Sequence, residues 1–277
     1  MIGIIDTGGG LRGIYGAGVF DYCLDKDIQF DYCIGVSAGC ANIMAYLGAL
    51  QFVDYSFYTK WLMDRNMISL SNFIKKGSAI DMDLLGSELS EDGVIPLDFS
   101  VIEENPADFV IVTTESTTAK PRYFTKSDLT RDDYGPAYAS ASLPFVNKPY
   151  RIGNDSFFDG GLSDPIPFRK AMDDGCDRIA VILTKPVDGS QDRRRDEAVA
   201  RAMEGHWPAA AEALRNRADL YQSELDELLE LEKDGRALIL APDEIGNMKT
   251  LTRDTEEMKE LYRKGLVDAQ VLNEWMR

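Results

Sequence analysis

Short apolar runs alternate with segments of helical periodicity over the first two thirds of the chain. Apolar runs of strand length stand at residues 1–6, 30–36, 109–114 and 178–183. Apolar residues recur at helical spacing at residues 11–24, 37–50 and 165–174, and the last of these segments is bounded by Pro165, Pro167 and Gly175. Strands that alternate with helices in this way predict an α/β fold, with a mostly parallel sheet and helices on both of its faces.

The chain changes character after residue 187. Residues 192–231 are rich in charged and helix-forming residues with a stripe of leucines, residues 237–240 form a late apolar run, and residues 255–275 predict a terminal helix. No internal repeat and no obvious linker separates this part from the rest. We therefore expect a single domain over residues 1–277, with its core at 1–186 and a mainly helical C-terminal portion at 187–277.

One long uncharged segment has two interpretations. Residues 32–53 contain no charged side chain and so imitate a membrane span in length and hydropathy. Glycine, serine and asparagine residues interrupt the segment, however. A buried strand followed by a buried helix accounts for it better.

Composition and charge narrow the classes of function. The 277 residues carry a formal net charge of -17, which repels phosphate backbones, so nucleic acid is not an expected partner. The four cysteines form no CxxC pair and stand in or beside apolar runs. They are typical of reduced, buried thiols, and no signal-peptide pattern precedes the first strand at Ile2, so we expect a cytoplasmic protein.

The sequence Gly35-Val36-Ser37-Ala38-Gly39 matches the G-x-S-x-G pattern of a nucleophile elbow. It follows a predicted strand and begins a predicted helix, which is the context that such an elbow requires. Glycines on both sides of Ser37 let the strand and the helix approach closely, and the N-terminus of the helix favours developing negative charge. The alternative is a tight strand-to-helix turn in which Ser37 only caps the helix.

The glycine-rich sequence Gly8-Gly9-Gly10-Leu11-Arg12-Gly13 also follows a predicted strand. It fits the dinucleotide fingerprint G-x-G-x-x-G, but that reading requires an acidic residue at the end of the second strand, and Ser37 stands there instead. Consecutive backbone N–H groups at the start of a helix bind any oxyanion. Because neighbouring parallel strands end at the same edge of a sheet, an oxyanion hole beside Ser37 is the more economical interpretation, and a turn needed only for packing is the remaining one.

A nucleophilic serine needs a base, and the sequence offers few. His206 is the only histidine and lies in a charged helical segment, which is typical of a surface or helix-break residue. The other candidate is Asp159, which follows two phenylalanines and precedes Gly160 and Gly161. An Asp-Gly-Gly sequence is usually a turn. We nevertheless favour Asp159 as the base, because the sequence offers Ser37 no other partner.

In this order, the glycine-rich sequence, the nucleophile motif and the Asp-Gly-Gly motif resemble those of the patatin-like phospholipases. The segment from Ala139 to Phe145 is similar to the segment that this family carries between nucleophile and aspartate. The resemblance covers roughly residues 1–186 and implies an α/β/α sandwich whose catalytic core is that part of the chain. It also implies hydrolysis of acyl esters of lipids, with phospholipids or lysophospholipids as the expected substrates and a neutral ester left open, and with no metal and no organic cofactor.

Site residues follow from the same resemblance. It implies that Ser37 is the nucleophile, that Asp159 is the base of a Ser–Asp dyad, and that Gly8, Gly9 and Gly10 form the oxyanion loop. Arg12 matches the basic position in that loop, where it braces the turn or contacts a phosphate. The remaining motif glycines are Gly13, Gly35, Gly39, Gly160 and Gly161. An ordinary aspartate is too acidic to be an efficient base, so partial burial is expected to raise the pKa of Asp159.

Substrate details and partners stay open at this level. The aromatic run from Phe52 to Phe73, which includes a predicted helix at 52–67, suits an acyl groove or a surface for transient membrane contact, although core packing explains such spacing more often. Head group, acyl length and oligomeric state have no signal in the sequence. A Rossmann-type nucleotide-binding protein and a non-catalytic lipid-binding module on the same fold are the alternative functions.

Overall fold

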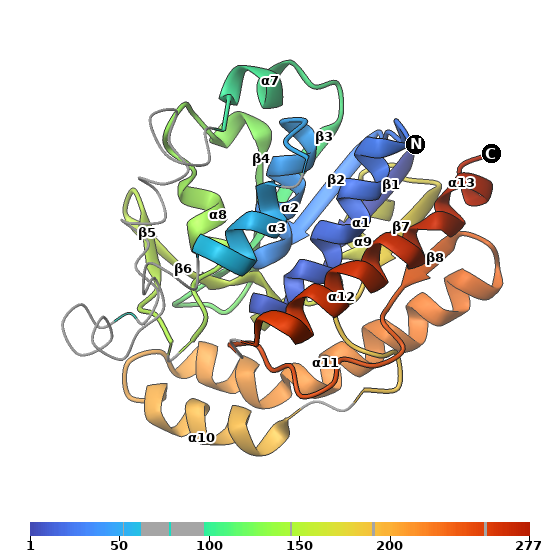
Figure 1. Ribbon diagram of the computed structural model, residues 1–277. Coiled ribbons are helices and arrows are strands. Elements are labelled where there is room, and N and C mark those ends of the chain that lie inside the picture. The colour runs from blue at the N-terminus through green and yellow to red at the C-terminus, as the bar shows by residue number, and fades with distance from the viewer. Residues whose placement is uncertain (52, 62–77, 79–96, 145, 190–191, 252–253) are drawn as a thin grey trace.

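The computed structural model in Figure 1 describes residues 1–51, 53–61, 78, 97–144, 146–189, 192–251 and 254–277. Its strands are β1 (Ile2–Asp6), β2 (Tyr32–Val36), β3 (Asp108–Glu115), β4 (Pro121–Thr125), β5 (Tyr150–Ile152), β6 (Asp155–Asp159), β7 (Arg178–Ile182) and β8 (Ala237–Leu240). Its α-helices are α1 (Ile14–Asp25), α2 (Ala38–Leu47), α3 (Val53–Ser56), α7 (Phe99–Glu104), α8 (Gly135–Ser140), α9 (Phe168–Asp173), α10 (Arg193–Met203), α11 (Pro208–Lys233), α12 (Thr255–Asp268) and α13 (Leu272–Trp275). Shorter helical turns lie at Gly10–Gly13 (η1), Phe57–Trp61 (η2, a π-helix), Lys126–Asp128 (η3), Gly160–Leu162 (η4) and Ala269–Val271 (η5).

The described strands form one mixed sheet in the order β5-β6-β3-β2-β1-β7-β8, and β4 also pairs with β3. The pairs that join β3, β2, β1, β7 and β8 are all parallel, while β4, β5 and β6 add antiparallel pairs at one side. The mostly parallel sheet predicted from the sequence is therefore confirmed. Figure 1 shows helices on both sides of this sheet.

Alternate residues of the central strands enter two separate cores. Ile4 of β1 and Ile111 of β3 pack into the larger cluster with α1, α2 and α12. Ile5 and Val112, the next residues along the same strands, pack into a second cluster with α9 and α11. This period of two explains why buried strands read as continuous apolar runs: both faces of the sheet are covered. The result is the three-layer α/β/α sandwich expected from the family resemblance.

The C-terminal portion covers both faces of the sheet. Helix α12 packs along α1, and α11 crosses the opposite face, where Leu225 and Leu228 enter the second core. Strand β8 pairs in parallel with β7 and so extends the central sheet. The helix-forming segment at 192–231 contains two helices, α10 and α11. They separate before Pro208, which has no backbone N–H to donate and stands in the first turn of α11.

Other differences from the sequence expectations are local. Helix α9 begins after Pro167 rather than at Pro165, and Gly175 follows its end with φ at 104°. The segment predicted as one helix at 52–67 is the short α3 followed by η2 as far as residue 61, and the remainder of the aromatic run to Phe73 lies outside the described residues. None of the described helices combines the length and the apolar character that crossing a bilayer requires.

Candidate active site

Three of the sequence motifs meet at one edge of the sheet. Strands β1 and β2 are parallel neighbours with Asp6 opposite Gly35, so the glycine loop after β1 and Ser37 after β2 lie side by side. Strand β6 runs antiparallel to β3 and ends at Asp159, which stands opposite Thr113. Because Val112 of β3 is paired with Val36, this register brings the end of β6 close to the turn that holds Ser37.

Ser37 sits in a strained turn between β2 and α2. Its φ of 56° and ψ of -127° lie outside the regions that non-glycine residues prefer, as a nucleophile elbow requires. A Cβ on Gly39 would lie 2.3 Å from the carbonyl oxygen of Asp6, so only glycine lets α2 start this close to β1. Gly13, Gly35 and Gly160 are packed against their neighbours with similarly short distances.

Helix α8 holds the two halves of the site together. The Ser37 N–H donates to Ser140 Oγ over 2.8 Å, and that hydroxyl donates to the Val112 carbonyl over 2.6 Å. Just beyond the helix, the Ser142 carbonyl accepts from the Asp159 N–H over 2.9 Å. One short segment therefore fixes the backbone positions of both Ser37 and Asp159.

Asp159 is buried with one oxygen engaged and the other free of hydrogen bonds. Its Oδ1 accepts from the Gly161 N–H over 2.8 Å, and its Oδ2 has no hydrogen-bond partner among the described residues. Burial raises the pKa of Asp159 to about 6 from an ordinary 3.8 and outweighs the opposing effects of the Ser37 hydroxyl and the Gly161 N–H. The rise expected from the sequence is confirmed. The Ser37 hydroxyl lies close enough to lower the pKa of the carboxyl group, although no hydrogen bond joins the two side chains in this structure.

The glycine loop turns sharply beside Ser37. Gly8, Gly9 and Gly10 have φ values of 63°, 128° and 63°, a succession that side-chain-bearing residues rarely adopt. The Gly8 N–H donates to Asp6 Oδ1 over 2.9 Å, so this amide braces the loop and is not offered to a ligand. The N–H groups of Gly9 and Gly10 make no hydrogen bond to another described residue, which leaves them as the candidate oxyanion donors.

Arg12 braces the loop from its other end. Its side chain is 7% exposed, and its Nε donates to the Thr184 carbonyl while Nη1 donates to Thr250 Oγ1, both over 3.2 Å. Both acceptors are neutral oxygens, and Arg12 forms no ion pair with any of the described residues. Burial lowers the pKa of this guanidinium to about 10. Of the two roles expected for Arg12, these contacts favour the bracing one.

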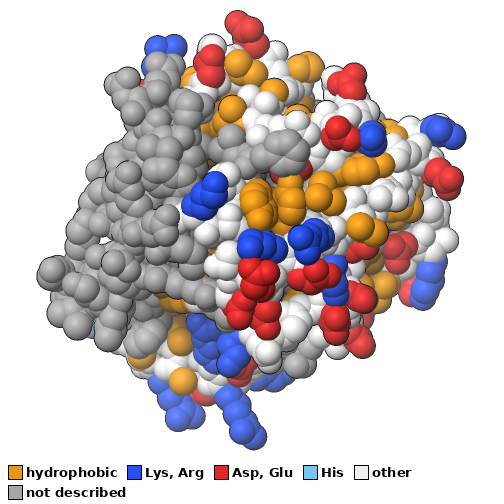
Figure 2. All heavy atoms as spheres, in the orientation of Figure 1, with side chains coloured by type: hydrophobic (Ala, Val, Ile, Leu, Met, Phe, Trp, Pro, Cys, Tyr) orange, Lys and Arg blue, Asp and Glu red, His pale blue; other side chains and the backbone are white. Residues whose placement is uncertain are grey.

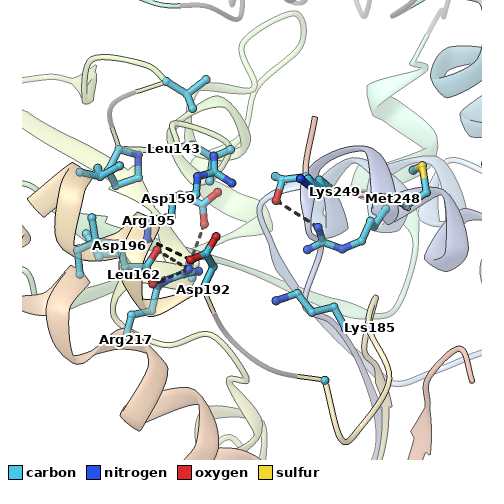
Figure 3. Close-up of a pocket in the computed structure, with 18 of the residues that line it drawn as sticks. Leu143, Asp159, Leu162, Lys185, Asp192, Arg195, Asp196, Arg217, Met248 and Lys249 are labelled. Atoms are coloured by element: carbon cyan, nitrogen blue, oxygen red, sulfur yellow. Dashed lines mark hydrogen bonds and ion pairs between the residues drawn. The ribbon is translucent and has the colours of Figure 1, made fainter. Parts of the chain in front are cut away.

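Two adjoining cavities open above these residues. A small cavity of about 110 Å³ is lined by Ser37, Asp159, the glycines of the loop and Arg12. It shares Asp159 and Arg12 with a wider cavity of about 470 Å³, whose apolar wall includes Leu143, Val146, Leu162, Val199, Leu214 and Met248. Figure 3 shows Asp159 at this shared wall. The arrangement can place a small polar group beside Ser37 and an apolar chain next to it.

His206 lies in the exposed break between α10 and α11 and lines neither cavity. Its ring packs against Trp207, with ring centroids 5.5 Å apart. The interpretation as a helix-break residue is confirmed. All four cysteines are buried and free, again as expected.

The comparison with known families agrees with the fold and with the order of the motifs. The model of the patatin-like phospholipases matches residues 7–172, well over half of the chain. The chain belongs to the patatin-like phospholipase family. This membership supports a lipid acyl hydrolase in general terms. A second model, a domain of unknown function designated DUF6363, matches residues 207–275 in the C-terminal portion of this patatin-like protein.

Individual relatives of this patatin-like protein are distant. The uncharacterized protein YjjU of Escherichia coli K12 is 26% identical over 188 residues, which are 67% of this chain and 52% of that protein. The chain thus spans about half the length of this relative. The crystal structure of VipD from Legionella pneumophila is similar with a TM-score of 0.49 and 13% identity, over 98% of this chain and 66% of that one.

Several residues at the site escaped the sequence analysis. Ser140 carried a signal, because it lies in the segment that resembles the family's, but nothing in the sequence pairs its hydroxyl with Ser37. Lys185 lies just after β7, which is the parallel neighbour of β1. Because neighbouring parallel strands end at the same edge of a sheet, its position near the glycine loop could have been predicted from the sequence. Arg217 of α11 and Thr250 lie far along the chain in a region without any motif, and only the folded chain brings them to the cavity.

Proposed function

We propose that this protein hydrolyses carboxylic esters of lipids through a Ser37–Asp159 dyad and an acyl-enzyme. The observation that carries the proposal is the pair itself: a strained serine and a buried carboxylate with one free oxygen line the same cavity. Family membership supports the class of reaction. Phospholipids or lysophospholipids are the proposed substrates.

In the first half of the reaction, Asp159 Oδ2 accepts the proton of the Ser37 hydroxyl while Oγ attacks the ester carbonyl carbon. This step requires a hydrogen bond between the two side chains, and catalytic hydrogen bonds often tighten only when substrate is bound. The tetrahedral intermediate then collapses, the carbon–oxygen bond to the alcohol breaks, and Asp159 returns the proton to the leaving alcohol oxygen. The acyl group remains on Ser37.

In the second half, Asp159 takes a proton from a water molecule that attacks the acyl-enzyme carbonyl. Collapse of this second intermediate breaks the bond to Oγ, Asp159 returns the proton to Oγ, and the fatty acid is released. The raised pKa of Asp159 suits both roles, since a group that ionises at about 6 accepts and returns protons near neutral pH more readily than one at 3.8.

Negative charge on the carbonyl oxygen needs donors in both halves. The N–H groups of Gly9 and Gly10, which bond to no other described residue, are the proposed donors, and each such donor is typically worth ~3 kcal/mol of transition-state stabilisation. The Gly8 N–H does not contribute, because it is held by Asp6. The acyl chain is proposed to lie against the apolar wall of the wider cavity.

Labelling with a fluorophosphonate probe tests the proposal directly, because the probe modifies only an activated serine. We expect the wild-type protein to be labelled at Ser37 and to hydrolyse a panel of acyl esters. Ser37→Ala should lose both properties, and the matched variant His206→Ala should keep both. Labelling that survives in Ser37→Ala, or a large loss of turnover in His206→Ala, would overturn the dyad.

A further inference from the structure

The polar side chains around the glycine loop differ from those of the outer surface. On the face shown in Figure 2, basic side chains stand beside acidic ones over much of the described surface. Examples of exposed ion pairs in the chain are Arg193 with Asp219 and Lys259 with Glu256. At the glycine loop, by contrast, buried side chains bond to the backbone of the loop itself. These contacts fix the backbone of the loop rather than neutralise a charge.

Three consecutive glycines leave the peptide units between them free to rotate. Glycine accepts positive φ as readily as negative φ, so a peptide unit between two glycines can turn over and exchange the positions of its C=O and its N–H. An oxyanion hole needs the N–H, and not the C=O, on the side of the substrate. The directions of the Gly9 and Gly10 N–H groups therefore depend on what holds the loop from outside.

Hydrogen bonds hold the loop at both of its ends and in its middle. At the first end, the Gly8 N–H donates to Asp6 Oδ1 over 2.9 Å. At the last, the Leu11 N–H donates to the Thr250 carbonyl, also over 2.9 Å. Between these two points, the Thr184 hydroxyl donates to the Gly8 carbonyl. The contact with Thr184 is therefore the one that acts on the peptide unit between Gly8 and Gly9.

The Thr184 hydroxyl sets the direction of the Gly9 N–H. In a planar trans peptide, the C=O of one residue and the N–H of the next point in opposite directions, and no peptide bond in the described part of the chain is cis. Because Thr184 holds the Gly8 carbonyl, the Gly9 N–H lies at the other edge of the same peptide plane. This N–H is one of the two proposed oxyanion donors.

Thr184 packs closely against the loop. Its side chain is 5% exposed, and a Cβ on Gly9 would collide with its hydroxyl oxygen. Its backbone carbonyl accepts from Arg12 Nε over 3.2 Å and so anchors the far end of the loop as well. Thr184 follows β7, the parallel neighbour of β1, and lines the small cavity together with Ser37. One residue thus contacts the loop at two points beside the candidate nucleophile.

We propose that Thr184 is a positioning residue of the oxyanion hole. Its hydroxyl prevents the Gly8–Gly9 peptide unit from turning over and so keeps the Gly9 N–H available to the oxyanion. The inference rests on the proposed function and adds a residue to that site. Thr184 lies outside both matched segments, 7–172 and 207–275, so neither family model covers it. Valine has nearly the same shape but no hydroxyl, and therefore cannot hold the carbonyl.

Substitutions of Thr184 test this role through kcat and KM for an acyl ester that the wild-type protein hydrolyses. Thr184→Val should lower kcat by about ten- to hundredfold and change KM by no more than about threefold, because an oxyanion donor acts in the transition state. Thr184→Ser keeps the hydroxyl and should stay within a few-fold of wild type. Thr184→Cys has only a weak S–H donor, so its kcat should fall between the two, and it replaces the valine variant if that one does not fold.

Tyr46→Phe is the matched control for a purely structural effect. Tyr46 is buried and lines neither cavity of the site, and its hydroxyl donates to the Ile28 carbonyl over 2.8 Å. This variant also loses a buried hydroxyl that bonds to a backbone carbonyl, so its stability to urea should fall while its kcat is kept. A decyl trifluoromethyl ketone, which adds to a serine as a tetrahedral oxyanion, gives a second measurement. Its inhibition constant should rise in Thr184→Val by the factor that kcat falls, and stay unchanged in Tyr46→Phe.

The direction of the Gly9 N–H separates this inference from the proposed function. Its residual dipolar coupling in NMR depends on that direction, and should change in Thr184→Val but not in Thr184→Ser or Tyr46→Phe. If the wild-type protein hydrolyses no ester and takes up no fluorophosphonate but the coupling changes as expected, the hydrolase proposal fails and the role of Thr184 in holding the loop stands. If esters are hydrolysed and Thr184→Val keeps its kcat, the inference is wrong and the hydrolase proposal stands. An unchanged coupling in Thr184→Val overturns the inference whatever the activity.

Discussion

Replacing Asp159 with asparagine should abolish turnover and also stabilise the folded protein at neutral pH. The carboxylate is 4% exposed, and burial raises its pKa to about 6 from 3.8. A difference of one pH unit between the folded and unfolded pKa corresponds to about 1.4 kcal/mol, so the charged carboxylate costs the folded state ~3 kcal/mol. The amide carries no charge and does not incur this cost.

The sign of the pH dependence follows from the two pKa values. Between pH 3.8 and about 6 the folded protein keeps a proton on Asp159 that the unfolded chain has lost, so rising pH through this window destabilises the folded state. The advantage of Asp159→Asn is thus absent below the window and complete above it. The new amide donor has the Ser37 hydroxyl as its neighbour, and a donor left unsatisfied costs about 1–3 kcal/mol. We therefore expect a net gain of roughly 0–2 kcal/mol at pH 8, and of up to ~3 kcal/mol where the Ser37 hydroxyl accepts a hydrogen bond from the new amide.

Urea unfolding at pH 8 and at pH 4.5 measures this gain. Asp155→Asn is the matched control, because Asp155 stands in the same strand but is exposed, and its stability should follow the wild type at both pH values. Asp6 is also buried with a pKa raised to about 6, but it is present in every variant and its contribution cancels. A stability difference between Asp159→Asn and wild type that is the same at pH 8 and at pH 4.5 would falsify the assignment of a desolvated carboxylate at this position.

Three further outcomes follow from the same geometry. The value of kcat/KM should fall below pH 6 and reach about a tenth of its plateau at pH 5, because Asp159 acts as a base only when it is ionised. A profile that is still flat at pH 5 would contradict the raised pKa. Ser140→Ala removes the acceptor of the Ser37 N–H and should lower kcat by about ten- to hundredfold. Ser142→Ala is its control and should leave kcat within a few-fold of wild type, because the Ser142 hydroxyl donates only to the Tyr138 carbonyl of α8. Gly39→Ala places a methyl group 2.3 Å from the last carbonyl oxygen of β1. This variant should lose most of the activity, and its free energy of unfolding in urea should fall by roughly 1–3 kcal/mol. An active, fully stable variant would show that β1 and α2 can separate freely.

Local pattern was sufficient to predict the parallel strands and most helices of the core. Buried strands are continuous apolar runs, and the helices that cover them carry a 3.6-residue period, so β1, β2, β3 and β7 were all anticipated within two residues. The exposed strands β4 and β5, by contrast, went unnoticed. Their residues are mostly partly or fully exposed, and pairing with β3 and β6 decides their conformation.

The proposed catalytic residues were found from sequence because each stands in a motif with a steric reason. A serine between two glycines after a strand, and three consecutive glycines before a helix, predict special backbone geometry without knowledge of the rest of the chain. Gly8 illustrates the limit of this reasoning. It was expected to donate to an oxyanion, but its N–H is engaged by Asp6, a contact that depends on how the loop closes.

The sequence by itself thus determined the layered α/β fold, the strained serine, the glycine loop and the aspartate, because these depend on local sterics and on the periodicity of burial. Only the tertiary structure decided which groups surround them. Ser140 holds the elbow, burial sets the pKa of Asp159, and Lys185 and Arg217 join Arg12 from distant parts of the chain. Contacts of this kind arise from the packing of whole elements, and desolvation is a property of the assembled surroundings rather than of any residue or its neighbours in sequence.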